Sequence, residues 1–260
     1  MKPEVLGALW SIALRDKGLF AKVSEEIIEH FYRTWIRHGD LAVDVGANVG
    51  RHLFPLVEAV GPEGRVFGFE PVPSLAAGLR SQIEQRNLAG RVEFQQAAVS
   101  DVRGRTAFFE VPDAPALSGL RARDDLSADQ TVNALETDVI TLDETIHDPV
   151  RFIKIDVEGG EFNVFKGARQ ILEKHKPVVA FEDGRGRSAR MYGYKMSEFY
   201  DFFEDCGYVV YDIFGFPTKL EMTKYSGPWN FFALPKGAED ARDALIAANM
   251  SVIWARLSKA

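Results

Sequence analysis

A glycine-containing turn carries the first residues that could bind a ligand. The segment Asp44–Gly50 reads Asp-Val-Gly-Ala-Asn-Val-Gly and begins inside the apolar run Leu41–Val45. Glycines at such a turn let the backbone bend sharply and approach a ligand closely. The helix that follows offers free N–H groups and the positive end of its dipole. The segment therefore predicts a ligand site between a strand and a helix.

An acidic residue ends the next apolar run. Glu70 closes the run Arg65–Glu70, and a carboxylate there can accept hydrogen bonds from both hydroxyls of a ribose. In open α/β sheets, ligands bind beyond the carboxyl ends of the strands. The turn and Glu70 together predict a nucleotide-like ligand at that edge.

Several classes of protein share these two features. A nicotinamide-dependent oxidoreductase needs a G-x-G-x-x-G cradle, and Asn48 stands where its middle glycine would be. Asp44 precedes the first glycine, where an acidic group suits a cationic amino-acid moiety better than a pyrophosphate. A tight turn that binds nothing and a non-catalytic protein that only binds a cofactor are also compatible with both features.

The elements that must position these residues are predicted strands and helices, which alternate along the chain. This alternation predicts an α/β fold with a mostly parallel sheet and helices on both faces. The predicted strands are Leu41–Val45, Arg65–Glu70, Arg91–Gln95, Arg105–Val111, Thr137–Thr141, Arg151–Asp156, Pro177–Glu182, Tyr208–Ile213 and Asn230–Leu234. The predicted helices are 51–60, 74–87, 161–175, 196–206 and 239–259.

The remaining segments have less regular patterns. Residues 4–37 are expected to be helical, with a break between two helices and Ser24 as the second N-cap. We expect this leader to pack beside the sheet or to join an oligomer interface. Residues 112–136 and the arginine-rich residues 184–193 are expected to be loops, which are often functional when long. The predicted division is a leader (1–38), a main domain (39–236) and a terminal helix (237–260).

Composition narrows the class of protein. The chain has 260 residues and a net charge of −7. This charge argues against an extended nucleic-acid-binding surface, since phosphate binding needs a basic face. No apolar run approaches the roughly 20 residues that span a bilayer, so no membrane partner is predicted. A single cysteine, Cys206, favours a reducing compartment. With no secretory pattern at the start, we predict a cytoplasmic protein.

Four segments, in their order along the chain, resemble the FkbM family of S-adenosylmethionine-dependent methyltransferases. The resemblance covers roughly residues 39–235 and is carried by Asp44-Val45-Gly46-Ala47-Asn48-Val49-Gly50, Phe69-Glu70-Pro71, Ala97-Ala98-Val99-Ser100 and Ile153-Lys154-Ile155-Asp156-Val157-Glu158-Gly159. It implies the class I methyltransferase (Rossmann-like) fold, a seven-stranded sheet whose last strand, Trp229–Pro235, runs antiparallel beside Pro177–Glu182. It also implies S-adenosylmethionine as the methyl donor and O-methylation of a small-molecule, sugar or polyketide-like acceptor.

The resemblance assigns roles by position. The turn Asp44–Gly50 would wrap the methionine part of the cofactor, Glu70 would hold the ribose, and Asp156 would lie near the reacting methyl group. Gln96 and Ala97 lie where the adenine is usually contacted. The implied cofactor-binding residues are Asp44, Gly46, Ala47, Asn48, Gly50, Glu70, Pro71, Gln96, Ala97 and Asp156.

Acidic residues after two later strands are candidates for a general base. A hydroxyl acceptor must lose its proton, and a positioned base contributes about 10²–10⁴-fold to the rate. We predict Asp156, Glu158 and Glu182 as catalytic residues. A different interpretation is that Glu158 or Glu161 caps the following helix. No metal site is predicted, because strand ends often carry acidic residues that bind no metal.

A homo-oligomer is also possible from the sequence, since the predicted helices at the two termini could pair two copies of the chain.

Overall fold

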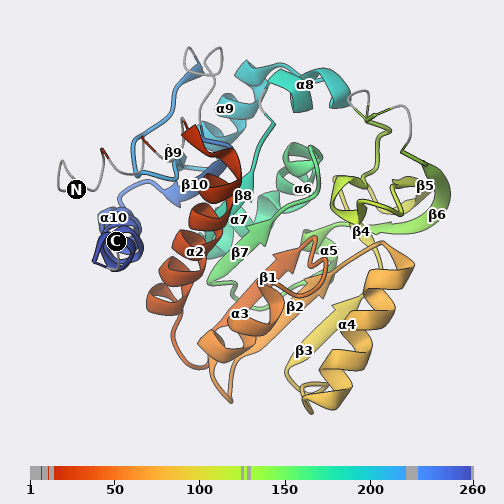
Figure 1. Ribbon diagram of the computed structural model, residues 1–260, viewed down its shortest axis with the longest axis horizontal. Coiled ribbons are helices and arrows are strands. Elements are labelled where there is room, and N and C mark those ends of the chain that lie inside the picture. Colours follow the sequence, from red (N-terminus) through yellow and green to blue (C-terminus); the bar gives the residue numbers. More distant parts are fainter. Residues whose placement is uncertain are drawn as a thin grey trace.

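A seven-stranded sheet forms the centre of the protein (Figure 1). The computed structural model describes residues 15–123, 126–127, 130–184, 186–220 and 228–258, together with Gly7 and Ser11. The strands are β1 (Leu41–Val45), β2 (Arg65–Phe69), β3 (Val92–Gln95), β7 (Phe152–Ile155), β8 (Val178–Glu182), β9 (Tyr208–Asp212) and β10 (Asn230–Pro235). Their order across the sheet is β3-β2-β1-β7-β8-β10-β9.

Parallel pairing brings the ends of the central strands together. Strand β1 pairs in parallel with β2 and with β7, so that Val45 lies opposite both Phe69 and Ile155. All five residues of β1 are buried, as expected for a parallel strand covered on both faces. The residues that follow these three strands therefore emerge side by side at one edge of the sheet.

The last strand of the sheet in sequence runs against its neighbours. Strand β10 pairs antiparallel with β8, with Phe231 opposite Phe181, and antiparallel with β9 on its other side. The antiparallel last strand beside Pro177–Glu182 is therefore confirmed.

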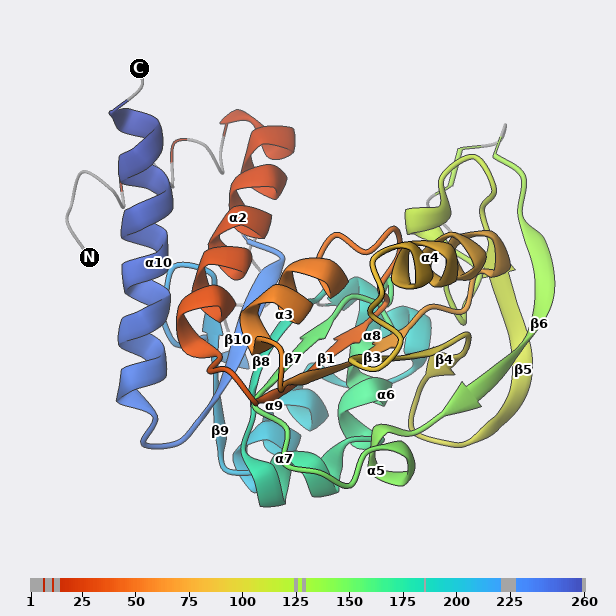
Figure 2. The same ribbon diagram turned by 90° about the horizontal axis from the view of Figure 1, so that it is seen from below.

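Helices cover both faces of the sheet, and each face has its own apolar core (Figure 2). One face carries α2 (Lys17–Trp35), α3 (Leu53–Val60), α4 (Pro73–Gln85) and α10 (Glu239–Leu257). The other carries α5 (Leu142–Thr145), α6 (Glu161–Lys166), α7 (Arg169–His175) and α9 (Met196–Asp205). The predicted mostly parallel sheet with helices on both faces is confirmed. Within the described residues, no helix is long and apolar enough to cross a membrane.

Helix α2 is continuous, and the predicted break at Ser24 is wrong. Asp16 is the N-cap, and Ser24 lies fully buried in the middle of the helix. The apolar residues before and after Ser24 share one helical phase, which outweighs the capping preference of a single serine. The expected packing against the sheet is confirmed, because Phe31 contacts Phe152 and Phe232. The earlier part of the predicted leader lies almost entirely outside the described residues.

A small second sheet lies beside the edge of the main sheet at β3 (Figure 2). It contains β4 (Ala98–Val99), β5 (Gly104–Glu110) and β6 (Asn133–Ile140), in the order β4-β6-β5. Strand β6 begins inside the segment 112–136 that was predicted to be a loop, so the predicted start at Thr137 is wrong. Antiparallel pairing with all of β5 extends it, from Val139 opposite Gly104 to Asn133 opposite Glu110. A short 3₁₀ helix, η1 (Pro115–Leu117), lies between the two strands.

Two helix predictions also need correction. The arginine-rich segment predicted to be a loop contains α8 (Gly186–Tyr192), in which Ser188 and Ala189 are buried. The single helix predicted over 161–175 is divided into α6 and α7. Gly167 and Ala168 lie between them, and Gly167 packs closely on the backbone of Ser100, where a Cβ atom would lie 2.1 Å from the carbonyl oxygen. Tertiary contacts decide both features, so local sequence patterns did not show them.

Candidate active site

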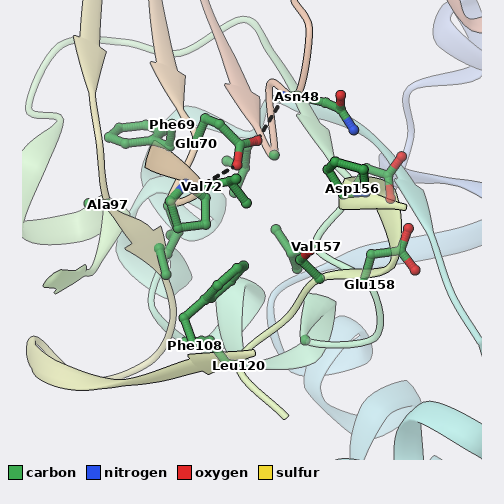
Figure 3. Close-up of a pocket in the computed structure, with 18 of the residues that line it drawn as sticks. Asn48, Phe69, Glu70, Val72, Ala97, Phe108, Leu120, Asp156, Val157 and Glu158 are labelled. Atoms are coloured by element: carbon green, nitrogen blue, oxygen red, sulfur yellow. Dashed lines mark hydrogen bonds between the residues drawn. The ribbon is translucent and has the colours of Figure 1, made fainter. Parts of the chain in front are cut away.

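A pocket lies at the carboxyl edge of β1, β2 and β7 (Figure 3). Phe69 and Ala97 form one side of it, and Asp156 and Glu158 lie on the opposite side. One side is therefore apolar and the other acidic. The lining residues are Val45, Gly46, Asn48, Phe69, Glu70, Pro71, Val72, Ala97, Ala98, Val99, Phe108, Pro115, Ser118, Leu120, Asp156, Val157, Glu158, Gly160 and Tyr192.

The turn after β1 is locked between the ends of its two neighbouring strands. The N–H groups of Gly46 and Ala47 both donate to the carbonyl oxygen of Phe69, each at 2.9 Å. Gly46 has a φ of 84°, and a Cβ atom there would lie 1.8 Å from the carbonyl oxygen of Asp156. Only glycine fits this close approach. Asn48, with a φ of 49°, is also left-handed.

Glu70 is fixed at the base of the pocket by two backbone N–H groups. The N–H of Asn48 donates to its Oε2 at 2.8 Å, and the N–H of Val72 donates to its Oε1 at 2.9 Å (Figure 3). Burial raises the pKa of Glu70 to about 6, although these two hydrogen bonds act in the opposite direction. Each carboxylate oxygen keeps a further lone pair. The carboxylate is thus oriented to accept hydrogen bonds from a diol such as a ribose.

Asp44 lies beneath the turn and does not line the pocket. It is 2% exposed, and among the described residues its Oδ2 has no hydrogen-bond partner. Burial raises the pKa of Asp44 to about 6, while the charges of His52 and Lys154 lower it. An orphaned buried carboxylate oxygen beside a glycine cradle fits a cofactor with a cationic amino-acid moiety.

A buried lysine supports Asp156 from below. Lys154 is 1% exposed, and its Nζ lies 3.4 Å from Oδ2 of Asp156. Burial lowers the pKa of Lys154, but the charges of Asp156, Glu25 and Glu182 outweigh burial and raise it. Lys154 is therefore a fixed cation that holds the Asp156 carboxylate at the pocket, where the Asp156 side chain is 34% exposed.

Glu25 on α2 belongs to the same charge cluster, and the sequence did not reveal it. Its carboxylate contacts Nε2 of His52, whose Nδ1 lies 3.3 Å from the Tyr32 hydroxyl. Burial raises the pKa of Glu25, but the hydrogen bond with His52 and the charge of Lys154 lower it to about 2. No local pattern links a helical acid to partners so far along the chain.

Glu158 forms an ion pair at the acidic side of the pocket. Nη1 of Arg123 lies 2.6 Å from its Oε2, and the Arg123 side chain is 11% exposed. Burial and the charge of Asp156 raise the pKa of Glu158 to about 7, whereas Arg123 lowers it. Arg123 was not predicted as a site residue because it stands in a run of charged residues with nothing to distinguish it.

Glu161 holds the loop after β7 in place. Its Oε1 accepts hydrogen bonds from the N–H groups of Val157 at 3.1 Å and Gly159 at 3.0 Å. Its Oε2 is buried and, within the described part of the chain, has no hydrogen-bond partner. Burial raises the pKa of Glu161 to about 8, which favours the protonated side chain at neutral pH. Glu161 therefore orders the loop that carries Glu158 rather than acting only as a helix cap.

The remaining predicted residues lie at different places around the pocket. Pro71 and Ala97 line it, whereas Ala47 and Gly50 belong to the turn behind it. Gln96 is exposed and lines a neighbouring hollow instead.

Glu182 ends β8 outside the pocket lining. Burial and the charge of Asp156 raise the pKa of Glu182 to about 9. The structure thus brings Asp156 and Glu158 together at the pocket and leaves Glu182 outside its lining, close enough for the charges of both to act on it. Across the described residues, no group of three or more His, Cys, Asp or Glu side chains could hold a metal ion.

Comparison with known proteins decides the family. Residues 44–210 match the family described as the methyltransferase FkbM domain. This chain belongs to that family. The resemblance drawn from the motifs is thereby confirmed. The family assignment favours a methyltransferase domain over a nicotinamide-dependent oxidoreductase.

Individual relatives cover only parts of this FkbM-family chain. The 31-O-demethyl-FK506 methyltransferase FkbM of Streptomyces tacrolimicus is 33% identical over 161 residues, which are 51% of this chain and 60% of that protein. The chain thus spans about 60% of that relative's length. A protein-L-isoaspartate O-methyltransferase of Ignicoccus hospitalis is 39% identical over 49 residues, 19% of this chain and 23% of that protein.

Solved structures include more distant FkbM and O-methyltransferase proteins. Methyltransferase FkbM from Methylobacillus flagellatus KT has a TM-score of 0.49 and 20% identity, covering 78% of this chain and 47% of that one. The O-methyltransferase from Bacillus cereus in complex with SAH has a TM-score of 0.46 and 15% identity, covering 91% and 92%.

Proposed function

We propose that this chain transfers the methyl group of S-adenosylmethionine to an oxygen of a small-molecule or glycan-like acceptor. The observation that carries the proposal is the pocket itself, which places the Glu70 carboxylate and the Asp156–Glu158 acidic pair on one cavity. Bound S-adenosylmethionine supplies an electrophilic methyl carbon on a sulfonium. Alignment of an acceptor with that carbon contributes up to roughly 7–11 kcal/mol in favourable cases.

Different residues of the pocket would bind different parts of the cofactor. Glu70 would accept hydrogen bonds from the ribose hydroxyls, and the backbone of Gly46 and Asn48 would lie against the methionine part. The apolar side formed by Phe69 and Ala97 would contact the adenine. Gly46 leaves room for this approach because it has no side chain.

Asp156 and Glu158 are the candidates to remove the acceptor's proton. Both line the pocket, and Lys154 holds Asp156 in place. The pKa of Glu158, raised to about 7, suits a general base because the best catalytic pKa lies near the working pH.

If Glu158 is that base, the rate of methyl transfer rises with pH through about 7, because only the ionised carboxylate accepts a proton. Arg123 lowers this pKa, so in Arg123→Gln the rising limb moves to higher pH by about 1 unit or more. Initial rates on either side of neutrality measure the shift. Arg103→Gln removes an exposed arginine from the turn before β5, and we expect no shift there. A limb that stays in place in Arg123→Gln would exclude Glu158 as the base.

A transfer assay tests the proposed function. Labelled S-adenosylmethionine is incubated with the protein and a panel of sugars, polyketides and other hydroxyl compounds, together with amine compounds. Label is expected on an oxygen of at least one hydroxyl compound. Transfer only to nitrogen would contradict the proposal. Cofactor binding without any transfer would favour a non-catalytic binding protein instead.

A further inference from the structure

A second pocket adjoins the first and contains three arginines. This arginine pocket is lined by Phe109, Arg121, Ala122, Arg187, Arg190 and Met191. Leu120 and Tyr192, the chain neighbours of Arg121 and Met191, line the first pocket. Consecutive residues of the chain thus line the two pockets at both places, and also at Phe108 and Phe109. The charge of Arg187 also acts on Glu158 in the first pocket, so the two pockets lie near each other.

Helix α8 is held against the loop that carries the acidic pair. A Cβ atom at Gly160 would lie 3.1 Å from the Tyr192 hydroxyl oxygen, and one at Gly159 would lie 3.4 Å from the Tyr192 ring. The two glycines therefore let α8 pack closely on this loop. Arg187 and Arg190, three positions apart on α8, share one face of the helix. The residues of α8 nearest the two glycines are Ser188, Met191 and Tyr192, so the packing fixes the helix while its arginine face lines the second pocket.

The charge of the arginine pocket opposes that of the rest of the protein. The chain carries a net charge of −7, yet none of the described residues that line this pocket is acidic. Glu158, which lines the first pocket, is paired with Arg123 at 2.6 Å and also interacts with the charge of Arg187, so Arg121 and Arg190 are the main cations offered to a ligand. Cations gathered in one hollow repel each other, and an anion between them offsets that repulsion. Guanidinium groups also match carboxylates and phosphates with two parallel hydrogen bonds.

We infer that the methyl acceptor carries a carboxylate or phosphate group that binds in the arginine pocket. The inference rests on the proposed function and names its substrate class. The anionic group lies among Arg121, Arg187 and Arg190, while Phe109 and Met191 contact the carbon skeleton. The acceptor's hydroxyl then extends past Leu120 and Tyr192 toward the acidic pair.

Calorimetry on the protein saturated with S-adenosylhomocysteine tests the inference. The probes are glucose 6-phosphate, glucuronate and, as their neutral parent, glucose. At least one anionic sugar is expected to bind about tenfold or more tightly than glucose, since hydrogen bonds to charged groups are the stronger ones. The phosphate and carboxylate probes show which anion the pocket prefers.

Substitutions locate the anion. Arg121 and Arg190 are both exposed, so the double variant Arg121→Gln/Arg190→Gln keeps the fold. It is expected to weaken binding of the anionic sugar about tenfold or more. Arg103→Gln, the matched control, leaves that affinity unchanged, and all variants bind S-adenosylhomocysteine as the wild type does.

Two results would overturn the inference. One is that neither anionic sugar binds more tightly than glucose, and the other is that the double variant binds the anion undiminished. Failure of the wild type to bind S-adenosylhomocysteine at all is a separate outcome, because it contradicts the proposed function itself.

Discussion

Replacing Gly46 with alanine is expected to weaken S-adenosylmethionine binding by about 100-fold or more, because the new methyl group has no space. A Cβ atom would lie 1.8 Å from the carbonyl oxygen of Asp156. The φ of 84° adds strain of about 1–2 kcal/mol for any residue with a side chain. Relief requires the turn after β1 to move away from the end of β7. That movement displaces both the Gly46–Asn48 backbone and Asp156.

Gly78→Ala is the matched control for this variant. Gly78 lies on α4, with nothing within 4 Å of a Cβ atom placed there, and alanine favours a helix by about 0.5–1 kcal/mol over glycine. We expect normal cofactor affinity and slightly higher stability. Circular dichroism and urea unfolding of both variants separate a local effect from loss of the fold. Unchanged affinity in Gly46→Ala would contradict the place given to the cofactor.

Replacing Asp156 with alanine is expected to lower kcat for methyl transfer about 100-fold or more. Asp156 follows β7, lines the pocket and lies 3.4 Å from the Lys154 ammonium. Loss of its carboxylate removes a candidate base and one of the charges that raise the pKa of Glu158. The fold is expected to persist because the ionised Glu25 still offsets the charge of Lys154. Initial rates with the acceptor found by the transfer assay measure the effect.

Measuring both kcat and cofactor affinity of Asp156→Ala distinguishes a catalytic role of Asp156 from a role in cofactor binding. A residue that acts on the transition state lowers kcat more than it lowers ground-state binding. Asp148→Ala is the control, since Asp148 precedes β7 at the opposite edge of the sheet with a side chain that is 58% exposed. We expect its kcat to be normal. A normal kcat in Asp156→Ala would remove Asp156 from the catalytic residues.

Much of the fold could be predicted because its central strands are continuous apolar runs in the sequence. Strands β1 and β8 are buried along their whole length or nearly so, and continuous apolar runs predict such strands well. Features set by contacts distant in sequence were missed. Helix α8 depends on packing against Gly159 and Gly160, and β6 is extended by its pairing with β5.

In the site, too, residues marked by a local sequence pattern were predicted, whereas residues defined by contacts far along the chain were missed. Gly46 and Glu70 were predicted to meet because each stands at the end of a parallel strand, and strand ends share one edge of a sheet. The family resemblance added Asp156 to this site. Arg123 and Glu25 were missed because their partners lie far along the chain. Gln96 shows the limit of assignment by position: it is exposed outside the pocket, whereas its neighbour Ala97 is buried and lines it. Neighbouring side chains along an extended segment point to opposite faces.

Calorimetric titration of the wild type and of Glu70→Ala shows whether the pocket at Glu70 binds S-adenosylmethionine. Glu70 offers two charged acceptors, and each hydrogen bond to a charged group contributes about 1.5–3 kcal/mol. The wild type is expected to bind one equivalent of the cofactor, and Glu70→Ala to bind it about 100-fold more weakly or worse. Absence of binding by the wild type, or equal affinity of the two proteins, would contradict the account.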